Sequence, residues 1–324
     1  MTRAFVTGIS GQDGGFLAER LLAQGSEVHA LILAGDPERA PADVVVHHGD
    51  LCDVDGTRRL LHDLAPDAVY NLAAISSVAE SWRRPELTAR VNGTAAVGLM
   101  ESALAVQDST GRPVRFVQAS SAEIFGQPAV SPQDESTPIR PVNPYGAAKA
   151  YAHLMVHVYR QRGLHASSAI LYNHESPRRP AHFVTRKITS TVAAIAHGIA
   201  EGLTLGNLEA RRDWGWAPDY VDALLRAAAA DRPDDYVVAT GEGHSVADFV
   251  AVAFRRVGID DWRPFVASDP ALTRPTDAAD LTGDATRART ALGWSPTVSF
   301  DDLVGRMVDA DLALLADQSS RPSR

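Results

Sequence analysis

The sequence predicts an α/β protein built on a doubly wound parallel sheet, followed by a smaller, discontinuous C-terminal substrate domain. Three observations support this prediction. Short apolar runs alternate with helical patterns in the first half, a glycine-rich turn follows the first run, and polar, arginine-rich segments begin after about residue 173. Alternating strands and helices are typical of βαβ units, whose parallel strands are buried on both faces and therefore read as continuous apolar runs.

The expected strands are short and almost wholly apolar. In chain order they span residues 3–7, 26–33, 43–47, 68–72, 115–119 and 167–171, and a run at 236–239 could return to the same sheet. The expected helices span about 14–23, 90–106, 144–162 and 188–198. We expect the polar segments 174–186 and 207–216 to be loops.

These elements suggest two domains, which is a reasonable number for 324 residues at about 150 residues per domain. A dinucleotide-binding domain is expected to comprise residues 1–172 together with about 214–258. A nucleotide-sugar-binding domain would comprise about 173–213 and 259–316, and residues 317–324 form a polar tail.

The composition disfavours several kinds of partner. The net charge is −9 and no Lys/Arg-rich run occurs, which argues against nucleic acid. The single cysteine, Cys52, and the lack of Cys/His clusters predict no metal site. The longest apolar runs are far shorter than the ~20 residues that span a bilayer, and the first residues do not have a signal-peptide pattern. We therefore expect a cytoplasmic protein with no membrane partner.

Residues 7–14, TGISGQDG, connect the first expected strand to the first expected helix. Glycines in this spacing let the backbone turn tightly and approach a pyrophosphate, which the helix N-terminus then stabilises. The pattern predicts a Rossmann-type dinucleotide site, the alternative being a tight turn without a ligand. The residues expected to contact the cofactor here are Gly8, Gly11, Gln12, Asp13 and Gly14.

Two further strand ends could contact the same ligand. Asp50 follows the third expected strand and could accept a hydrogen bond from an adenine amino group while Leu51 packs on the ring; alternatively, Asp50 only starts a turn. The fourth expected strand closes on small residues that allow a cofactor to approach, or that mark a simple strand end: Leu72, Ala73 and Ala74.

Tyr145 and Lys149 lie four residues apart on an expected helix, so they share one face. A lysine there can lower the pKa of the phenol and hold a nicotinamide ribose, which would make Tyr145 a general base. Ser121, at the end of an expected strand, favours this interpretation over a surface helix pair. Of the 31 basic residues only Lys149 and Lys187 are lysine, which suggests that arginine does not serve at these positions.

With these motifs in place, the chain resembles the extended short-chain dehydrogenase/reductases, and among them the GDP-mannose 4,6-dehydratase family. The resemblance spans residues 3 to about 312, and NHESPRR and RDWG are its most specific segments. The matching segments are TGISGQDG at 7–14, YNLAA at 70–74, QASSAE at 118–123, NHESPRR at 173–179, FVTRK at 183–187, LGNL at 205–208, RDWG at 212–215 and RPTD at 274–277.

The resemblance implies a redox-neutral dehydration of GDP-mannose, or a close GDP-sugar, to GDP-4-keto-6-deoxy-mannose. Tyr145, assisted by Ser121 and Lys149, would take the C4 hydroxyl proton while hydride passes to the nicotinamide. Glu123 would remove the C5 proton as water leaves C6, and hydride would return to C6. Arg212 and Arg274 would clamp the diphosphate, and Arg178 and Arg179 are either site or surface residues. The substrate-binding residues implied by the resemblance are Asn173, Glu175, Lys187, Arg212, Arg274 and Asp277.

Three positions depart from the family pattern. Ala122 replaces the usual Ser or Thr, and Ser76–Ser77 stand where a His is common. Leu33 and Ala34 replace an Arg pair that reads the 2′-phosphate of NADP. The whole-chain resemblance implies NADP, NAD remains open because of Leu33 and Ala34, and Arg39 could substitute for the missing cations.

Two other functions remain open. A GDP-sugar 4-epimerase or 4-keto reductase would have no need of a base at Glu123, and a non-catalytic dinucleotide-binding protein would have no need of Ser121, Tyr145 and Lys149. The resemblance further implies a homodimer formed through helices 90–106 and 144–162. The shortened loop at about 35–42 should weaken the contacts that make tetramers in the family.

Overall fold

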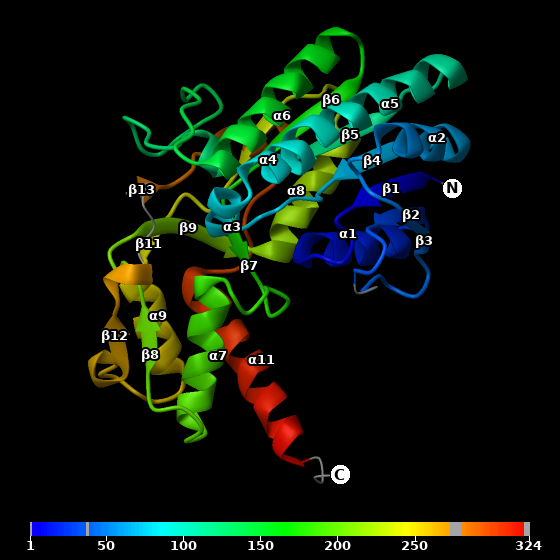
Figure 1. Ribbon diagram of the computed structural model, residues 1–324. Coiled ribbons are helices and arrows are strands. Elements are labelled where there is room, and N and C mark those ends of the chain that lie inside the picture. Colours follow the sequence, from blue (N-terminus) through cyan, green and yellow to red (C-terminus); the bar gives the residue numbers. More distant parts are fainter. Residues whose placement is uncertain (1, 37–38, 273–279, 321–324) are drawn as a thin grey trace.

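A seven-stranded parallel sheet forms the centre of the computed structural model, which describes residues 2–36, 39–272 and 280–320 (Figure 1). The strand order is β10-β6-β5-β4-β1-β2-β3, so the order reverses between β1 and β4. Ligands of doubly wound sheets bind at such a reversal, beyond the carboxyl ends of the strands. The strands are β1 (Arg3–Thr7), β2 (Glu27–Ile32), β3 (Val45–His48), β4 (Ala68–Asn71), β5 (Arg115–Ala119), β6 (His165–Leu171) and β10 (Asp235–Val238).

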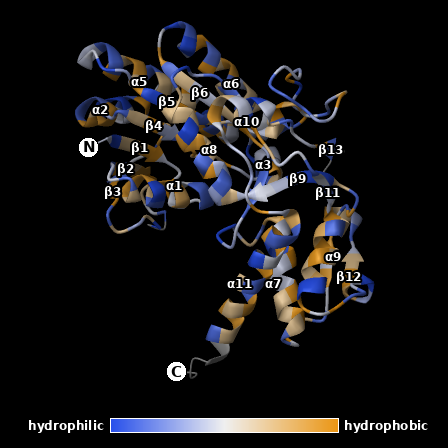
Figure 2. Ribbon diagram, turned by 180° about the vertical axis from the view of Figure 1, so that it is seen from behind, coloured by the Kyte–Doolittle hydropathy of each residue, from blue (hydrophilic) through white to orange (hydrophobic). Residues whose placement is uncertain are grey.

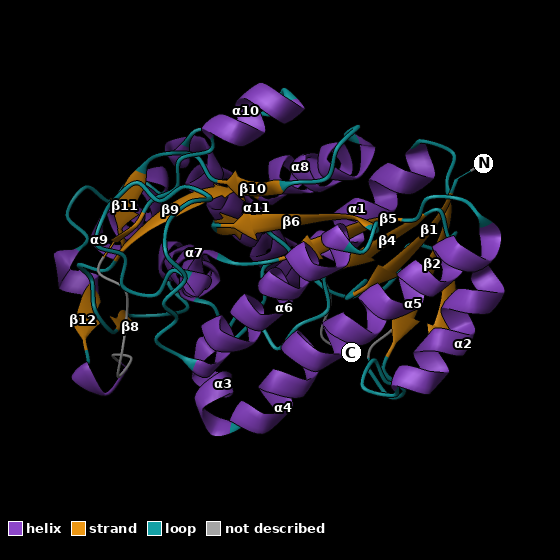
Figure 3. Ribbon diagram, turned by 90° about the horizontal axis from the view of Figure 1, so that it is seen from above, coloured by secondary structure: helices purple, strands orange, loops and turns teal. Residues whose placement is uncertain are grey.

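Helices cover both faces of this sheet, as the view from above shows (Figure 3). One face packs on α2 (Val54–Leu64), α5 (Ala95–Thr110) and α6 (Pro144–Gln161), around Phe5 and Phe116. The opposite face packs on α1 (Gln12–Ala23), α8 (Ala217–Ala229) and α10 (Thr286–Leu292). Both faces are apolar because neither meets water, which explains the uninterrupted apolar strands.

A second apolar core lies beyond the carboxyl ends of the strands. It is built from α7 (Val184–Ala196), α9 (Val246–Arg256) and α11 (Phe300–Ser320), and α9 is strongly apolar in Figure 2. Short strands join these helices: β7 (Asn173–Glu175), β11 (Gly243–Ser245) and β13 (Asp280–Leu281) pair with β9 (Arg211–Trp216), and β8 (Leu203–Leu205) pairs with β12 (Val266–Ser268).

Short helices complete the chain. Ser77 caps the first of them by accepting a hydrogen bond from Glu80 N. They are α3 (Val78–Arg83), α4 (Pro85–Ala89), the π-helix η1 (Arg90–Thr94), and the 3₁₀-helices η2 (Ala122–Ile124), η3 (Arg263–Phe265) and η4 (Pro270–Leu272).

The expected Rossmann-type sheet and the return of the strand near 236–239 to it are confirmed. Three local expectations were wrong. The segment 174–186, expected to be a loop, contains the end of β7 and the start of α7. The helix expected from residue 90 begins as the π-helix η1 before α5, and the segment 207–216, expected to be a loop, contains β9. The polar segment Arg211–Trp216 forms strand β9 because three other strands pair with it, and Arg212 and Asp213 are buried there.

The domain boundaries stay a prediction, and two helices pack across them. α9 lies within the range assigned to the dinucleotide-binding domain but packs in the second core. α10 lies within the range assigned to the other domain, but Ala288 and Leu292 pack in the core of the main sheet. In the described part of the chain, no helix is long and apolar enough to cross a membrane, and no three His, Cys, Asp or Glu residues are grouped to hold a metal ion.

Candidate active site

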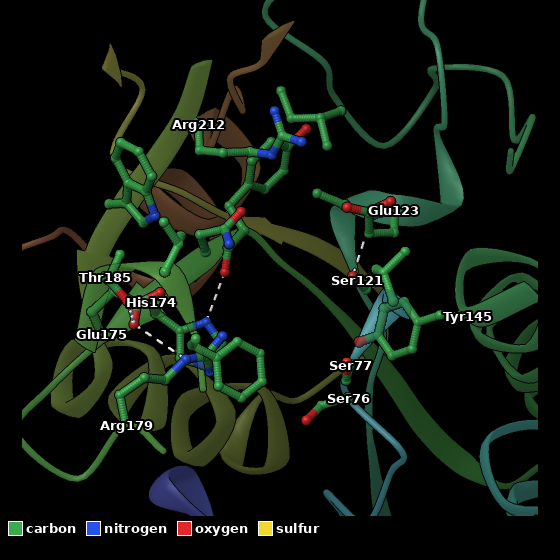
Figure 4. Close-up of a pocket in the computed structure, with 18 of the residues that line it drawn as sticks. Ser76, Ser77, Ser121, Glu123, Tyr145, His174, Glu175, Arg179, Thr185 and Arg212 are labelled. Carbon is green, nitrogen blue, oxygen red and sulfur yellow. Dashed lines mark hydrogen bonds and ion pairs between the residues drawn. The ribbon is translucent and has the colours of Figure 1, made fainter. Parts of the chain in front are cut away.

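A cavity of about 400 Å³ lies between the carboxyl ends of the central strands and the second core. In Figure 4, Ser121, Glu123 and Tyr145 lie on one side of it, and His174, Glu175 and Arg179 on the other. The residues singled out from the sequence that line the cavity are Asp13, Leu72, Ala74, Ser121, Glu123, Tyr145, Lys149, Asn173, Glu175, Lys187 and Arg212.

The glycine turn has the shape that a dinucleotide needs. Gly8 has a φ of +73°, and a Cβ built on it would lie 2.8 Å from Ala73 N, so only glycine fits between β1 and β4. A Cβ on Gly14 would lie 2.2 Å from Gly8 O. The turn thus brings the N-terminus of α1 to the cavity with a glycine, Gly11, at the N-cap position, and a helix N-terminus suits a pyrophosphate.

Thr7 fixes the neighbouring strand end in the same place. Its Oγ1 accepts hydrogen bonds from Leu72 N and Ala73 N, both at 3.1 Å, and donates to Asn71 Oδ1 at 2.7 Å. The segment after β4 is therefore held against the glycine turn. The two segments singled out for cofactor binding are adjacent in space, and their residues fit a dinucleotide.

Asp50 lies outside the cavity lining. It is exposed, and its Oδ1 accepts a hydrogen bond from Cys52 N at 2.8 Å, so it does form the turn that was the alternative interpretation. Leu51 is half-buried and packs beside the core under α2 and α5. Their contact with an adenine stays a prediction.

Ser121, Tyr145 and Lys149 come together at the end of β5. Lys149 is buried, its Nζ donates to Ala119 O at 2.8 Å, and the same Nζ lies 5.9 Å from the centroid of the Tyr145 ring. The Ser121 hydroxyl beside the phenol acts to lower the pKa of Tyr145. The three side chains that the sequence singled out thus share one wall of the cavity.

The pKa values of this group differ from the expectation. Burial raises the pKa of Tyr145 to about 12 and outweighs the opposing effect of the Ser121 hydroxyl, and the Glu123 and Asp13 carboxylates act in the same direction as burial. Burial likewise lowers the pKa of Lys149 to about 8. The expected lowering of the phenol pKa by Lys149 is therefore not found, because both groups are desolvated.

Glu123 lies on η2, two residues after Ser121, and its backbone N–H donates to Ser121 Oγ at 3.2 Å. Its carboxylate accepts a hydrogen bond from Asn143 Nδ2 at 2.8 Å. Asn143 also caps α6, because its Oδ1 accepts from Gly146 N at 2.8 Å. Gly146 permits this close packing, since a Cβ there would lie 2.4 Å from Glu123 O. One buried amide thus fixes Glu123 relative to the helix that carries Tyr145.

The opposite wall carries the candidate substrate-binding residues. Lys187 Nζ donates to Thr204 O at 2.7 Å, and Arg212 Nη1 donates to Arg211 O at 2.7 Å. Glu175 is buried, and its carboxylate binds Thr185 at 2.7 Å and Arg179 at 3.2 Å, so it holds Arg179 at the cavity. Arg274 and Asp277 lie outside the described residues.

Sequence reasoning missed two residues and left two others undecided. Asn143 and His174 were not singled out, although both contact residues that were. Of the two undecided arginines, Arg179 lines the cavity, whereas Arg178 forms an exposed ion pair with Glu19. Asn143 had a signal, an Asn–Pro at the start of an expected helix, which is typical of a cap.

A doubly wound sheet with a glycine turn after β1, and a Ser–Tyr–Lys group beside it, defines an extended short-chain dehydrogenase/reductase. The sequence model of the GDP-mannose 4,6 dehydratase family matches residues 5–307. The chain therefore belongs to the GDP-mannose 4,6-dehydratase family, and the resemblance stated from its motifs is confirmed.

Individual relatives agree with this membership. The chain is 45% identical to GDP-mannose 4,6 dehydratase 1 of Arabidopsis thaliana, over 96% of this chain and 90% of that protein. It is 40% identical to GDP-mannose 4,6 dehydratase of Homo sapiens, over 96% and 92%. The crystal structure of the UDP-glucose 4-epimerase of Thermus thermophilus in complex with NAD is similar, with a TM-score of 0.82 and 29% identity over 96% of this chain and 99% of that one.

Proposed function

We propose that the chain converts GDP-mannose to GDP-4-keto-6-deoxy-mannose with loss of water. One observation carries the choice among related reactions: the Glu123 carboxylate lies on the same wall as Ser121 and Tyr145, fixed by Asn143. A base for the C5 proton is needed for elimination and not for hydride transfer at C4 alone. The family of the chain supports the same reaction over the epimerase alternative.

The side chains would divide the proton transfers between them. Tyr145, which lines the cavity together with Ser121, takes the proton of the C4 hydroxyl. The resulting ketone acidifies the C5 proton, which Glu123 removes as hydroxide leaves C6. The two protons taken up by Tyr145 and Glu123 would then be returned, one to the hydroxide to give water and one to C5 as C6 is reduced. A nicotinamide bound at the glycine turn would supply a reversible hydride acceptor and a positive charge near the phenol. Oxidation at C4 and reduction at C6 balance, so no external oxidant is consumed.

The cations of the opposite wall suit the nucleotide. Lys187, Arg179 and Arg212 line the cavity from the second core, and the planar guanidinium group of an arginine suits bidentate binding of phosphate oxygens. We assign the diphosphate to this wall and the hexose to the wall with Tyr145. The assignment of Asn173 and of Arg274 and Asp277 to the nucleotide sugar stays part of this proposal.

The cofactor in this proposal is NADP, with NAD as the alternative. NADP is what the resemblance of the motifs implies. At the end of β2, however, Leu33 is 48% exposed and Ala34 is exposed, so neither supplies a cation for a 2′-phosphate, and Arg39 is the exposed cation in the loop that follows. Extraction of the bound nucleotide from purified protein decides between them. Recovery of NAD alone contradicts the NADP assignment, and Arg39→Ala should then leave cofactor retention unchanged.

A homodimer would bury an apolar stripe on α6. Tyr151, Leu154 and Val158 are 45%, 53% and 46% exposed, and their spacing places them on one side of the helix. Helices 90–106 and 144–162 were expected to form this interface. Light scattering that shows a monomer or a stable tetramer would contradict a dimer, and Leu154→Glu should shift a dimer to monomer.

Mass spectrometry of the product tests the reaction itself. Incubation with GDP-mannose should give a product lighter by one water, without added reductant. A product of unchanged mass would favour an epimerase, a reaction that runs only with added reductant would favour a 4-keto reductase, and binding without turnover would indicate a binding protein.

A further inference from the structure

Arg186 and Asp311 form a buried ion pair between α7 and α11, which lie side by side in the second core (Figure 1). The Nε of Arg186 lies 3.0 Å from both carboxylate oxygens of Asp311, and its Nη2 donates to the same carboxylate. Thr189 Oγ1, three residues further along α7, donates to Asp311 Oδ2 at 2.7 Å. The side chains of Arg186 and Asp311 are 13% and 4% exposed, so water competes little with the pair.

The guanidinium group of Arg186 has a further contact outside the ion pair. Its Nη1 donates to Pro177 O, in the loop that joins β7 to α7. This carbonyl belongs to a tight turn in which Arg179 N donates to Ser176 O at 3.0 Å. Because the donors of a guanidinium group form a fixed planar fork, one side chain can bind a carboxylate and a carbonyl at the same time. Arg186 therefore ties the turn at 176–179 to both α7 and α11.

The turn at 176–179 ends on Arg179, a cation that lines the cavity. Glu175 pairs with the Arg179 side chain at 3.2 Å, and the guanidinium carbon of Arg179 lies 3.8 Å from the centroid of the Phe183 ring. In Figure 4, Arg179 and Glu175 lie on the wall opposite Tyr145. Arg186 itself does not line the cavity, so it can act on a ligand only through the residues that it holds.

We propose that Arg186 is a positioning residue for the diphosphate-binding wall, clamping the turn that carries Arg179 to α7 and α11. The inference rests on the proposed function, since a diphosphate is the ligand assigned to this wall. Binding of phosphate oxygens by an arginine depends on the direction of its guanidinium plane, so movement of the turn would weaken it. The nucleotide sugar and the dinucleotide both carry a diphosphate, and the experiment distinguishes these two sources.

The two contacts of Arg186 can be separated by substitution. Asp311→Asn keeps an oxygen that can accept from Arg186 and leaves the contact with Pro177 in place, but it removes one charge of a buried pair. Arg186→Met combined with Asp311→Leu removes both charges and also the contact with Pro177. Apolar replacement of a whole buried ion pair is often neutral for stability or favourable, whereas removal of one partner is costly. If the pair served stability alone, Asp311→Asn should bind nucleotide less well than the double variant, and a clamp predicts the reverse.

The test measures the dissociation constants of GDP, NADP⁺ and NAD⁺ by calorimetry, together with the thermal unfolding of each variant. Arg186→Met/Asp311→Leu should unfold near the wild-type temperature but bind GDP about tenfold more weakly, within the usual range of coupling between sites. Asp311→Asn should unfold at a lower temperature and keep the wild-type affinity for GDP. Arg186→Lys should lose affinity as the double variant does, because a compact ammonium group paired with Asp311 cannot also hold Pro177.

Arg256 and Asp309 supply the matched control. They form a two-point ion pair between α9 and α11, at 2.8 and 2.6 Å, only two residues from Asp311 on α11. Their side chains are 52% and 48% exposed, and neither lines the cavity. Arg256→Lys should therefore bind all three nucleotides as the wild type does.

Unchanged affinity for all three nucleotides in Arg186→Lys and in Arg186→Met/Asp311→Leu overturns the inference. An affinity for GDP that follows the unfolding temperature across the variants also overturns it. Weaker binding of the dinucleotides with unchanged binding of GDP supports the clamp and assigns the diphosphate of the cofactor to this wall. A wild type that binds GDP without dehydrating GDP-mannose overturns the proposed reaction and not the clamp. If the double variant does not fold, Arg186→Lys and Asp311→Asn still give the two opposite results that the clamp requires.

Discussion

Asn143 donates a hydrogen bond to the Glu123 carboxylate at 2.8 Å while capping the helix that carries Tyr145. The candidate base for C5 and the candidate base for the C4 hydroxyl are therefore fixed relative to each other by one buried amide. Ser caps a helix as well as Asn does, but its hydroxyl is too short to keep the contact with Glu123. The two functions of Asn143 can therefore be separated.

Asn143→Ser should slow dehydration with little change in stability. We expect a rate loss of about tenfold to hundredfold, because a small misplacement of a reacting group has an effect of that size. Asn143→Ala should lose the same rate and in addition about 1 kcal/mol of unfolding free energy, the usual cost of a missing cap. Product formation and thermal unfolding measure the two effects. Equal rates for Asn143→Ser and the wild type would show that the amide contributes only the cap.

Glu123→Gln should stop elimination while leaving the first hydride transfer possible. Gln has nearly the same shape as Glu but cannot accept the C5 proton, and a general base typically contributes about 10²–10⁴-fold. Deuterium exchange at C5 and product formation, both measured in heavy water, report on this step. Tyr145→Phe is the contrasting variant, since it should block both half-reactions. Dehydration by Glu123→Gln at the wild-type rate would assign the carboxylate to the turn alone.

Lys149→Met should abolish activity and raise stability at neutral pH. Lowering the pKa of Lys149 from 10.5 to about 8 means that burial of the charged form costs about 3 kcal/mol below pH 8. Loss of the hydrogen bond from Lys149 to Ala119 O destabilises the variant by about 1 kcal/mol. We therefore expect a net gain of about 2 kcal/mol in unfolding free energy.

The pH dependence shows whether Lys149→Met is more stable because a buried charge is removed or because methionine packs better. Between about pH 8 and 10.5 the unfolded chain binds the proton of Lys149 and the folded chain does not, so wild-type stability rises with pH across that window. The advantage of Lys149→Met should shrink over the same window. Lys187→Met, at the other lysine, is the control, because Lys187 is only partly buried and its replacement should change stability little. A difference that does not vary with pH would contradict the buried charge.

Local sequence patterns were sufficient to predict strands of the main sheet. The bounds of β1 and β5 agree with the apolar runs, because strands buried on both faces must be apolar throughout. β9 could not be found in this way, since Arg211–Trp216 is polar and becomes a strand only through pairing with β7, β11 and β13. That pairing joins segments distant in the chain.

The same distinction between local patterns and long-range contacts applies to the site residues. Ser121, Tyr145 and Lys149 could be found because helical spacing and strand ends constrain them locally, and all three line the cavity. His174 could not, because its partner Asp13 is 161 residues away and no periodicity connects them. The direction of the Tyr145 pKa shift could not be predicted from the sequence either, since burial decides it and burial depends on the whole fold.

Asp213 should prove essential for stability although it does not line the cavity. It is fully buried next to Arg212, and its carboxylate accepts hydrogen bonds from Thr240 N and Oγ1 at 2.8 and 2.7 Å, from Gly241 N at 2.8 Å and from Gly283 N at 3.3 Å. β9 is thereby tied to the segment after β10 and to the segment after β13. An anion with this many donors accepts from all of them, which an amide cannot do.

Asp213→Asn places an NH₂ group against backbone N–H donors and leaves at least one of them unpaired and buried. Because each such group costs about 1–3 kcal/mol, we expect a loss of at least about 1 kcal/mol in unfolding free energy. Displacement of β9 also moves Arg212, so KM for GDP-mannose should rise more than kcat falls. Asp261→Asn is the matched control, since the Asp261 side chain is 66% exposed and pairs with the nearby Arg263, at 3.2 Å. Denaturant unfolding of the two variants measures the difference, and equal stabilities would mean that the four contacts of Asp213 are not needed to hold β9.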